Sequence, residues 1–88
     1  MNYKDIQNEI VTEKNSANSP EEKLTNIYHI YRDRTNFLIG QAKTEKAKEQ
    51  AMEISQQVQK LVKKIYDEYS DKGLVPTEIE VLYSLEIF

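Results

Sequence analysis

Cysteine is absent from the sequence, and histidine occurs only once, at His29. The lack of cysteine excludes disulfides, thiolate zinc sites and thiol nucleophiles. A single histidine cannot supply the two Glu-x-x-His motifs of di-iron bundles, and no serine lies in a GxSxG context. We therefore predict no catalytic residue, no metal site and no cofactor, and we expect that the chain is not an enzyme.

Glycine and proline occur only twice each, which is too rare for the many turns of a β protein. The longest uninterrupted apolar run is three residues, Phe37 to Ile39, whereas a helix needs about 20 to cross a bilayer. Residues 1–5 lack the apolar segment of a secretory signal. These absences predict a soluble, cytoplasmic and mainly helical protein.

A strongly basic segment is missing as well. Residues 1–44 carry six basic and six acidic side chains, residues 45–88 carry six and nine, and the net charge is −3. Nucleic-acid binding normally depends on a basic surface, so we expect no DNA or RNA partner.

The second half of the chain contains a regular apolar repeat with steps of four and three residues. Its members are Ala47, Ala51, Ile54, Val58, Leu61 and Ile65. Residues three or four positions apart stack on one face of an α-helix. The repeat therefore predicts one long helix with this stripe buried. Val62, Tyr66 and Tyr69 widen the stripe toward its C-terminal end, where we expect the helix to pack against more than one neighbour.

Local signals place the start and end of the preceding helix. Ser19 is a predicted N-cap, Pro20 occupies the first helical position, and Glu22 completes a capping box. Gly40 offers a C-cap at the other end. Four apolar residues before Lys14 predict a shorter first helix.

Gly73 is predicted to end the long helix, and Thr77 with Glu80 repeats the capping-box pattern for a last helix. The 88 residues are expected to form a single domain, residues 1–88. We predict an all-α, antiparallel up-and-down four-helix bundle with a short first helix and a long third helix. The predicted helices cover residues 3–13, 20–39, 44–70 and 77–87.

Two surfaces are candidates for binding. Lys60, Lys63 and Lys64 form a basic cluster, which is either a solvated helix face or a contact for an acidic partner or anionic lipid. Three lysines would support only weak peripheral membrane contact. The last helix carries apolar side chains on nearly every side, and a terminal helix cannot bury all of them, so part of it should remain exposed as a contact site.

Three segments of the second half resemble the pediocin-like bacteriocin immunity proteins, most nearly the enterocin A immunity type. They are residues 60–69 (KLVKKIYDEY), 73–78 (GLVPTE) and 82–85 (LYSL). The resemblance implies a cytosolic four-helix bundle that protects a producing bacterium by engaging the mannose phosphotransferase permease with its bound bacteriocin. It implies no cofactor. Since specificity in that family lies in the C-terminal half, it points to six partner-binding residues: Lys60, Lys63, Lys64, Tyr83, Ile87 and Phe88.

Two other classes of function remain open from the sequence. The chain could be a small cytosolic adaptor or anti-regulator whose last helix docks in a groove of a partner protein. It could also be a self-associating module in which the apolar repeat completes a dimeric bundle. We therefore expect a monomer or a weak homodimer.

Overall fold

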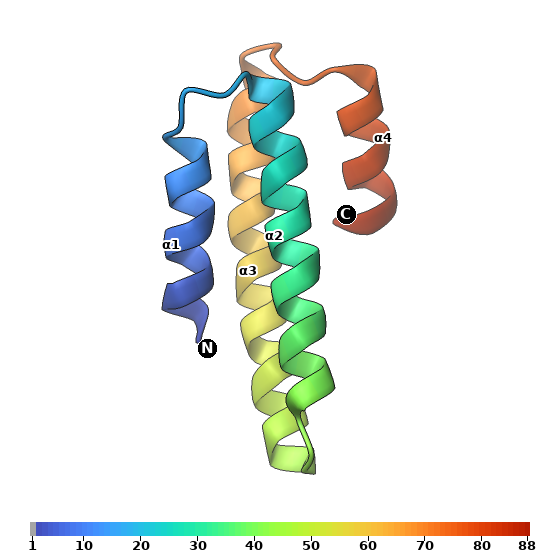
Figure 1. The fold of residues 1–88 in the computed structure, drawn as a ribbon. Coiled ribbons are helices and arrows are strands. Elements are labelled where there is room, and N and C mark those ends of the chain that lie inside the picture. The colour runs from blue at the N-terminus through green and yellow to red at the C-terminus, as the bar shows by residue number, and fades with distance from the viewer. Residues whose placement is uncertain (1) are drawn as a thin grey trace.

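The computed structural model describes residues 2–88, which contain four helices and no strand. The helices are α1 (Tyr3–Lys14), α2 (Pro20–Gln41), α3 (Glu45–Asp71) and α4 (Thr77–Glu86). Consecutive helices run in opposite directions, as Figure 1 shows. The predicted all-α four-helix bundle is confirmed, and every predicted helix boundary lies within two residues of the observed one.

The four helices differ greatly in length, and this difference shapes the molecule. The central hairpin pairs α2, with 22 residues, and α3, with 27, whereas α1 has 12 residues and α4 has 10. At about 1.5 Å per residue, α3 alone spans most of the 43 Å long dimension. Since α1 and α4 are short, they flank only the upper part of the hairpin in Figure 1.

The hairpin therefore has two parts, which we name by their surroundings. The covered half comprises residues 20–34 of α2 and 56–71 of α3, and the distal half comprises residues 35–41 and 45–55. Helix α1 lies against both α2 and α3, while α4 lies against α2 and reaches α3 only through side chains. The distal half extends beyond both short helices.

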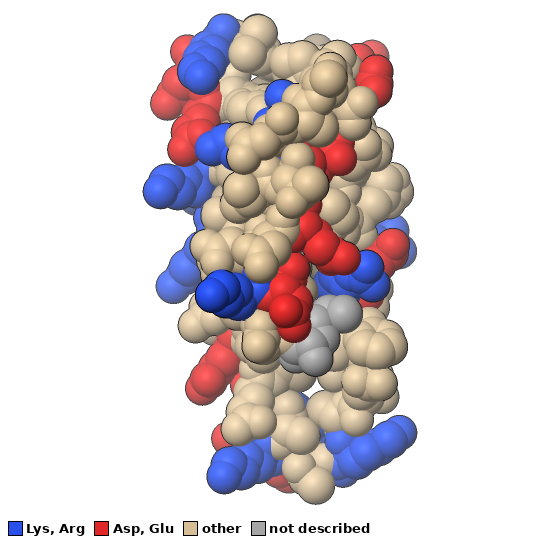
Figure 2. Space-filling model, turned by 60° about the vertical axis from the view of Figure 1, so that its left-hand side comes forward, with Lys and Arg blue, Asp and Glu red and all other residues tan. Residues whose placement is uncertain are grey.

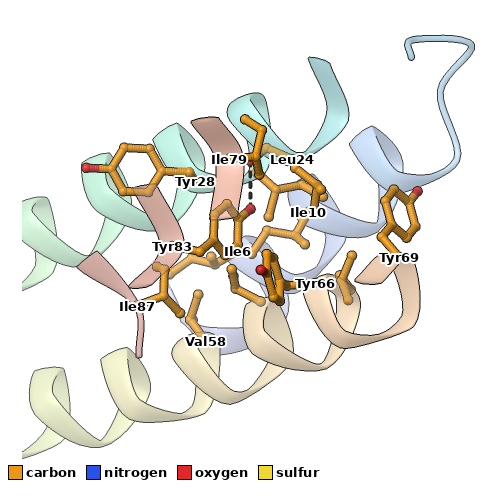
Figure 3. Packing of buried hydrophobic residues seen from close by; sticks show 13 residues of the cluster. Ile6, Ile10, Leu24, Tyr28, Val58, Tyr66, Tyr69, Ile79, Tyr83 and Ile87 are labelled. Atoms are coloured by element: carbon orange, nitrogen blue, oxygen red, sulfur yellow. Dashed lines mark hydrogen bonds between the residues drawn. The ribbon is translucent and has the colours of Figure 1, made fainter. Parts of the chain in front are cut away.

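The hydrophobic core lies in the covered half (Figure 3). Tyr83 is its central side chain: it is fully buried, and its hydroxyl donates a 2.7 Å hydrogen bond to the Leu24 carbonyl. The ring of Tyr83 stacks on Tyr66 at a centroid distance of 4.9 Å. The other buried members are Ile6, Ile10, Ile27, Tyr28, Val58, Val62, Ile65, Tyr69, Ile79 and Ile87.

The helix caps confirm part of the sequence prediction. The Ser19 hydroxyl accepts from the Glu22 backbone N–H at 3.2 Å, and Pro20 begins α2, as expected. Gly73 adopts φ +70° after α3, where a left-handed residue lets Leu74 N–H reach the Tyr69 carbonyl at 2.9 Å.

Two other predicted caps are wrong. Helix α2 continues through Gly40 to Gln41 and ends at Ala42, where the backbone turns extended, so Gly40 is an ordinary helical residue. Thr77 is already the first residue of α4, and Pro76 at the N-cap offers no side-chain acceptor. Conversely, α1 begins with a reciprocal capping box between Asn2 and Asp5 that the sequence analysis missed.

The buried stripe of α3 is shifted from the predicted one. Ile54 and Leu61 are only half-buried, because they lie at the edge of the stripe and not at its centre. Val62, Tyr66 and Tyr69 are buried, as predicted for the widened C-terminal part of the stripe, because α3 meets α2, α1 and the side chains of α4. The buried residues of α3 are Ala51, Ser55, Val58, Val62, Ile65, Tyr66 and Tyr69.

Candidate functional site

The structure separates the six predicted contact residues into buried and exposed groups. Tyr83 and Ile87 are buried in the core, so the prediction that they form part of a contact surface is wrong. They lie on the side of α4 that packs toward α2 and α3, where Tyr83 also contacts the rings of Tyr28 and Tyr66. The exposed group is Lys60, Lys63, Lys64 and Phe88.

The outer side of α4 carries apolar side chains that the residue-level prediction missed. Leu85 is 78% exposed and Val81 is 52% exposed. They are four residues apart and therefore lie on one helix face, turned away from the buried pair Ile79 and Tyr83. A helical wheel of residues 77–87 could have identified this face once the inner residues were known.

Phe88 adds a further exposed apolar side chain at the end of α4, on the side that faces α3. Its side chain is 53% exposed, and its ring meets Tyr66 edge-on at 4.9 Å. Its backbone N–H donates to the Tyr83 carbonyl at 3.0 Å, and the Gln59 side-chain amide donates to the neighbouring Ile87 carbonyl. The terminal residue is thus fastened to α3 with much of its ring still accessible.

Lys63 is the lysine that joins this surface. Its Nζ lies 5.7 Å from the centroid of the Phe88 ring, a cation–π arrangement. Lys63 also lines a hollow of about 280 Å³ together with Gln56, Gln59 and Lys60. The Lys63 ammonium and the Phe88 ring therefore form one amphipathic contact point.

The predicted three-lysine cluster is divided between two sides of α3. Lys60 borders hollows on both sides, whereas Lys64 faces α1 beside Tyr3 and Gln7. Lys64 also acts electrostatically on Glu68, whose pKa is lowered mainly by its 2.9 Å hydrogen bond from Lys14. Of the three lysines, Lys63 is the one that lies over the Phe88 ring.

The charges of α4 itself are all negative. Glu78, Glu80 and Glu86 are exposed, and the helix has no basic residue. Burial raises the pKa of Tyr66, with a further contribution from Glu80. We define the α4 surface as Val81, Leu85 and Phe88 with Lys63 at one edge and these carboxylates around it.

His29 does not join the α4 surface. Its side chain is exposed on α2, with the Tyr28 ring at 5.3 Å. Within residues 2–88, no group of three or more His, Asp and Glu side chains is arranged to hold a metal ion. None of the helices in this part of the chain is long and apolar enough to cross a membrane. What the α4 surface offers is an apolar contact with charges at its rim.

Comparison of the chain with family models, with curated proteins and with solved structures finds no match.

Proposed function

We propose that this protein is a non-enzymatic binding protein of the bacteriocin-immunity type. In this proposal it acts in the cytoplasm, and its α4 surface engages a mannose phosphotransferase permease that carries a pediocin-like bacteriocin. It uses no cofactor. Engagement protects the producing cell from the bacteriocin.

The observation that supports a binding role is the exposure of Leu85 and Val81 on a helix whose opposite side is fully buried. An exposed apolar row rimmed by charged residues is typical of a protein–protein contact site. The position of this row is fixed by Tyr83, because its buried hydroxyl on α4 donates a hydrogen bond to the Leu24 carbonyl of α2.

The choice of partner rests on the resemblance of residues 60–85 to the immunity proteins and on the predicted helix order, which the structure shares. The revised contact residues are Val81, Leu85, Phe88 and Lys63. Lys60 and Lys64 contribute at most at the edge, since only Lys63 lies against the α4 surface.

The test is the survival of a sensitive strain that expresses the chain in its cytoplasm. We expect protection against a narrow set of pediocin-like bacteriocins. Leu85→Ser should reduce protection strongly, while Met52→Ser should leave it unchanged, since Met52 is an exposed apolar residue of the distal half, away from α4. Lys63→Glu should also reduce protection, because it reverses a charge at the contact edge.

Two results would contradict the proposal. One is no gain in survival across a broad bacteriocin panel, and the other is equal protection by the wild type and the Leu85→Ser variant. Circular dichroism of both variants should match the wild type, so that any loss is assigned to contact and not to unfolding.

A cytosolic adaptor that docks α4 in a partner's groove would use the same surface. Gene context separates the two proposals, since a leader-bearing bacteriocin precursor beside this gene favours immunity. A neighbouring cluster of transcription-factor or phage genes favours the adaptor.

A further inference from the structure

Helices α1 and α3 border a recess of about 630 Å³ that shares no residue with the α4 surface. We call it the α1–α3 recess, and its lining residues are Tyr3, Gln7, Gln57, Lys60, Leu61 and Lys64. Tyr3 and Gln7 are four positions apart on α1, and Lys60 and Lys64 are four positions apart on α3, so each pair lies on one helix face. The described residues that line the recess thus supply two ammonium groups, two amides and a phenol hydroxyl, and include no carboxylate.

The two lysines of the recess are not neutralised by a neighbouring acid. Neither Lys60 nor Lys64 takes part in a salt bridge within residues 2–88. Glu68, one turn after Lys64, accepts instead from Lys14 at 2.9 Å. Two like charges four positions apart destabilise a helix, and a bound anion would remove that repulsion. The charge of the recess therefore favours an anionic ligand.

The neutral polar groups of the recess are also available to a ligand. No side-chain hydrogen bond within residues 2–88 uses Tyr3, Gln7 or Gln57. Amide groups can both donate and accept, so they match the hydroxyl groups of a ligand. The Tyr3 ring and the Leu61 side chain add apolar surface for a carbon skeleton.

The surrounding charges favour a small ligand over a large one. In Figure 2, which brings the α1 side forward, basic side chains project from the left edge at mid-height, while acidic side chains gather down the middle of the face. An anionic membrane or an acidic protein would cover the whole face and meet these carboxylates, on a chain of net charge −3. A small anion meets only the recess, whose volume lies in the range of roughly 300–1,000 Å³ that is typical of small-molecule sites.

We infer that the α1–α3 recess binds a small phosphorylated and hydroxylated molecule of the sugar-phosphate class. The phosphate lies against Lys60 and Lys64, and the hydroxyl groups bond to Gln7 and Gln57. A free phosphate ion would fill only a small part of the recess and leave both amides unused. Since both lysines are exposed, we expect weak binding, with a Kd of about 1 mM. The inference is independent of the proposed function, which uses the α4 surface.

Titration of the isotope-labelled full chain with glucose 6-phosphate, followed by amide NMR shifts, tests the inference. Shift changes should appear at Gln7, Gln57 and Leu61 and should saturate with a Kd of about 1 mM. Leu85, on the α4 surface, should show none. The absence of saturating changes in the recess up to about 10 mM ligand would overturn the inference.

Variants of the lysines show whether the phosphate lies where we place it. Lys60→Gln and Lys64→Gln should each weaken binding at least about fivefold, because each removes a charge-assisted hydrogen bond. Lys48→Gln is the matched control: it removes the same charge from an exposed lysine of α3 outside the recess, and it should bind like the wild type. All variants must show the helical content of the wild type. Gln57→Glu, which adds a carboxylate to the recess at an exposed residue, replaces a lysine variant that fails to fold.

Three further ligands identify the source of the anion. Glucose should cause no shift changes, and inorganic phosphate should bind at least about fivefold more weakly than glucose 6-phosphate. Vesicles of phosphatidylglycerol should not bind. Equal affinities for inorganic phosphate and glucose 6-phosphate would overturn the inference, and so would vesicle binding that depends on Lys60 and Lys64. An equal loss of binding in Lys48→Gln and Lys64→Gln would also overturn it.

Discussion

The covered and distal halves of the α2–α3 hairpin belong to the same two helices but are built from different residues. In the covered half, the buried residues are large and include Leu24, Ile27 and Tyr66. In the distal half, the buried residues are Thr35, Ala51 and Ser55. The covered half thus carries nearly all of the apolar burial, and the distal half continues it as little more than two paired helices.

The distal half buries two hydroxyl groups. Both are hydrogen-bonded, so the distal half does not carry the energetic cost of an unsatisfied buried polar group. Thr35 Oγ1 donates to the Tyr31 carbonyl at 2.7 Å, and Ser55 Oγ donates to the Ala51 carbonyl at 2.8 Å. Each hydroxyl is satisfied inside its own helix, so neither ties α2 to α3. The distal half is therefore held by helix continuity and by the half-buried Leu38 and Ile54, which pack against the core.

The short helices add polar ties only to the covered half. Glu9 pairs with Arg34, and Lys14 pairs with Glu68, so α1 is fastened to both helices of the hairpin. The comparison teaches that the difference in helix length separates a region with a packed core from a region with little buried apolar surface.

The largest expected difference concerns the same substitution in each half. Leu24→Ala removes a fully buried side chain and should lower the free energy of unfolding by about 2–5 kcal/mol. Leu38→Ala, on the same helix but half-buried in the distal half, should cost less than about 2 kcal/mol. Urea unfolding measures both, and equal costs would remove the distinction between the halves.

The second-largest loss of stability is expected when the hydrogen bond of Tyr83 is removed. Tyr83→Phe keeps the ring and deletes the hydroxyl that binds the Leu24 carbonyl, so it should cost about 1 kcal/mol. Burial raises the Tyr83 pKa above its ordinary value of 10.0, so its stabilising contribution is complete below pH 10 and is lost as the pH rises further.

Urea unfolding between pH 8 and 11 checks this effect. The wild type should lose more stability than Tyr83→Phe across that range. An identical pH dependence in the two proteins would show that the hydroxyl is not buried as described.

A smaller effect is expected for the tie between α1 and α2. Glu9→Gln weakens the pair with Arg34, and its effect on thermal stability at pH 7 should be below that of Tyr83→Phe, because both side chains are 40% exposed.

The Arg34 hydrogen bond lowers the Glu9 pKa below 4.5, so the contribution of this carboxylate is present above pH 4.5 and is lost as the pH falls further. The variant should lose less stability than the wild type between pH 5 and 3, as thermal melts would show. A variant more acid-sensitive than the wild type would contradict the pairing.

The smallest effect on stability is expected on the α4 surface. Leu85→Ser should change the free energy of unfolding by no more than about 0.5 kcal/mol, since the side chain makes little contact within the chain. Chemical denaturation checks this, and a cost above 2 kcal/mol would mean that Leu85 belongs to the core.

The fold followed from the sequence because its signals are local. The Ser19–Pro20 start, the Gly73 end and the four-and-three apolar repeat each depend on residues within one or two turns. The first helix was found from its apolar spacing, although its Asn2–Asp5 cap was missed.

The contact surface was harder to predict, because exposure depends on how distant helices meet. Tyr83 and Phe88 are both aromatic residues of the last segment, yet one is the centre of the core and the other is half exposed. Their difference in exposure depends on distant contacts: Tyr83 binds the Leu24 carbonyl, 59 positions away in the chain, and Phe88 packs on the Tyr66 ring. Nor does periodicity show that Lys63 rather than Lys64 lies against Phe88, since that depends on which sides of α3 are taken by α1 and α4.

Native-state hydrogen exchange tests the contrast between the two halves most directly. The comparison is between amides of the same helices, residues 27–31 and 58–62 against residues 37–41 and 48–52. Residues 27–31 and 58–62 should exchange only on global unfolding, whereas the distal segments should exchange at least about tenfold faster through local opening. Equal protection along the full length of α2 and α3 would contradict the account.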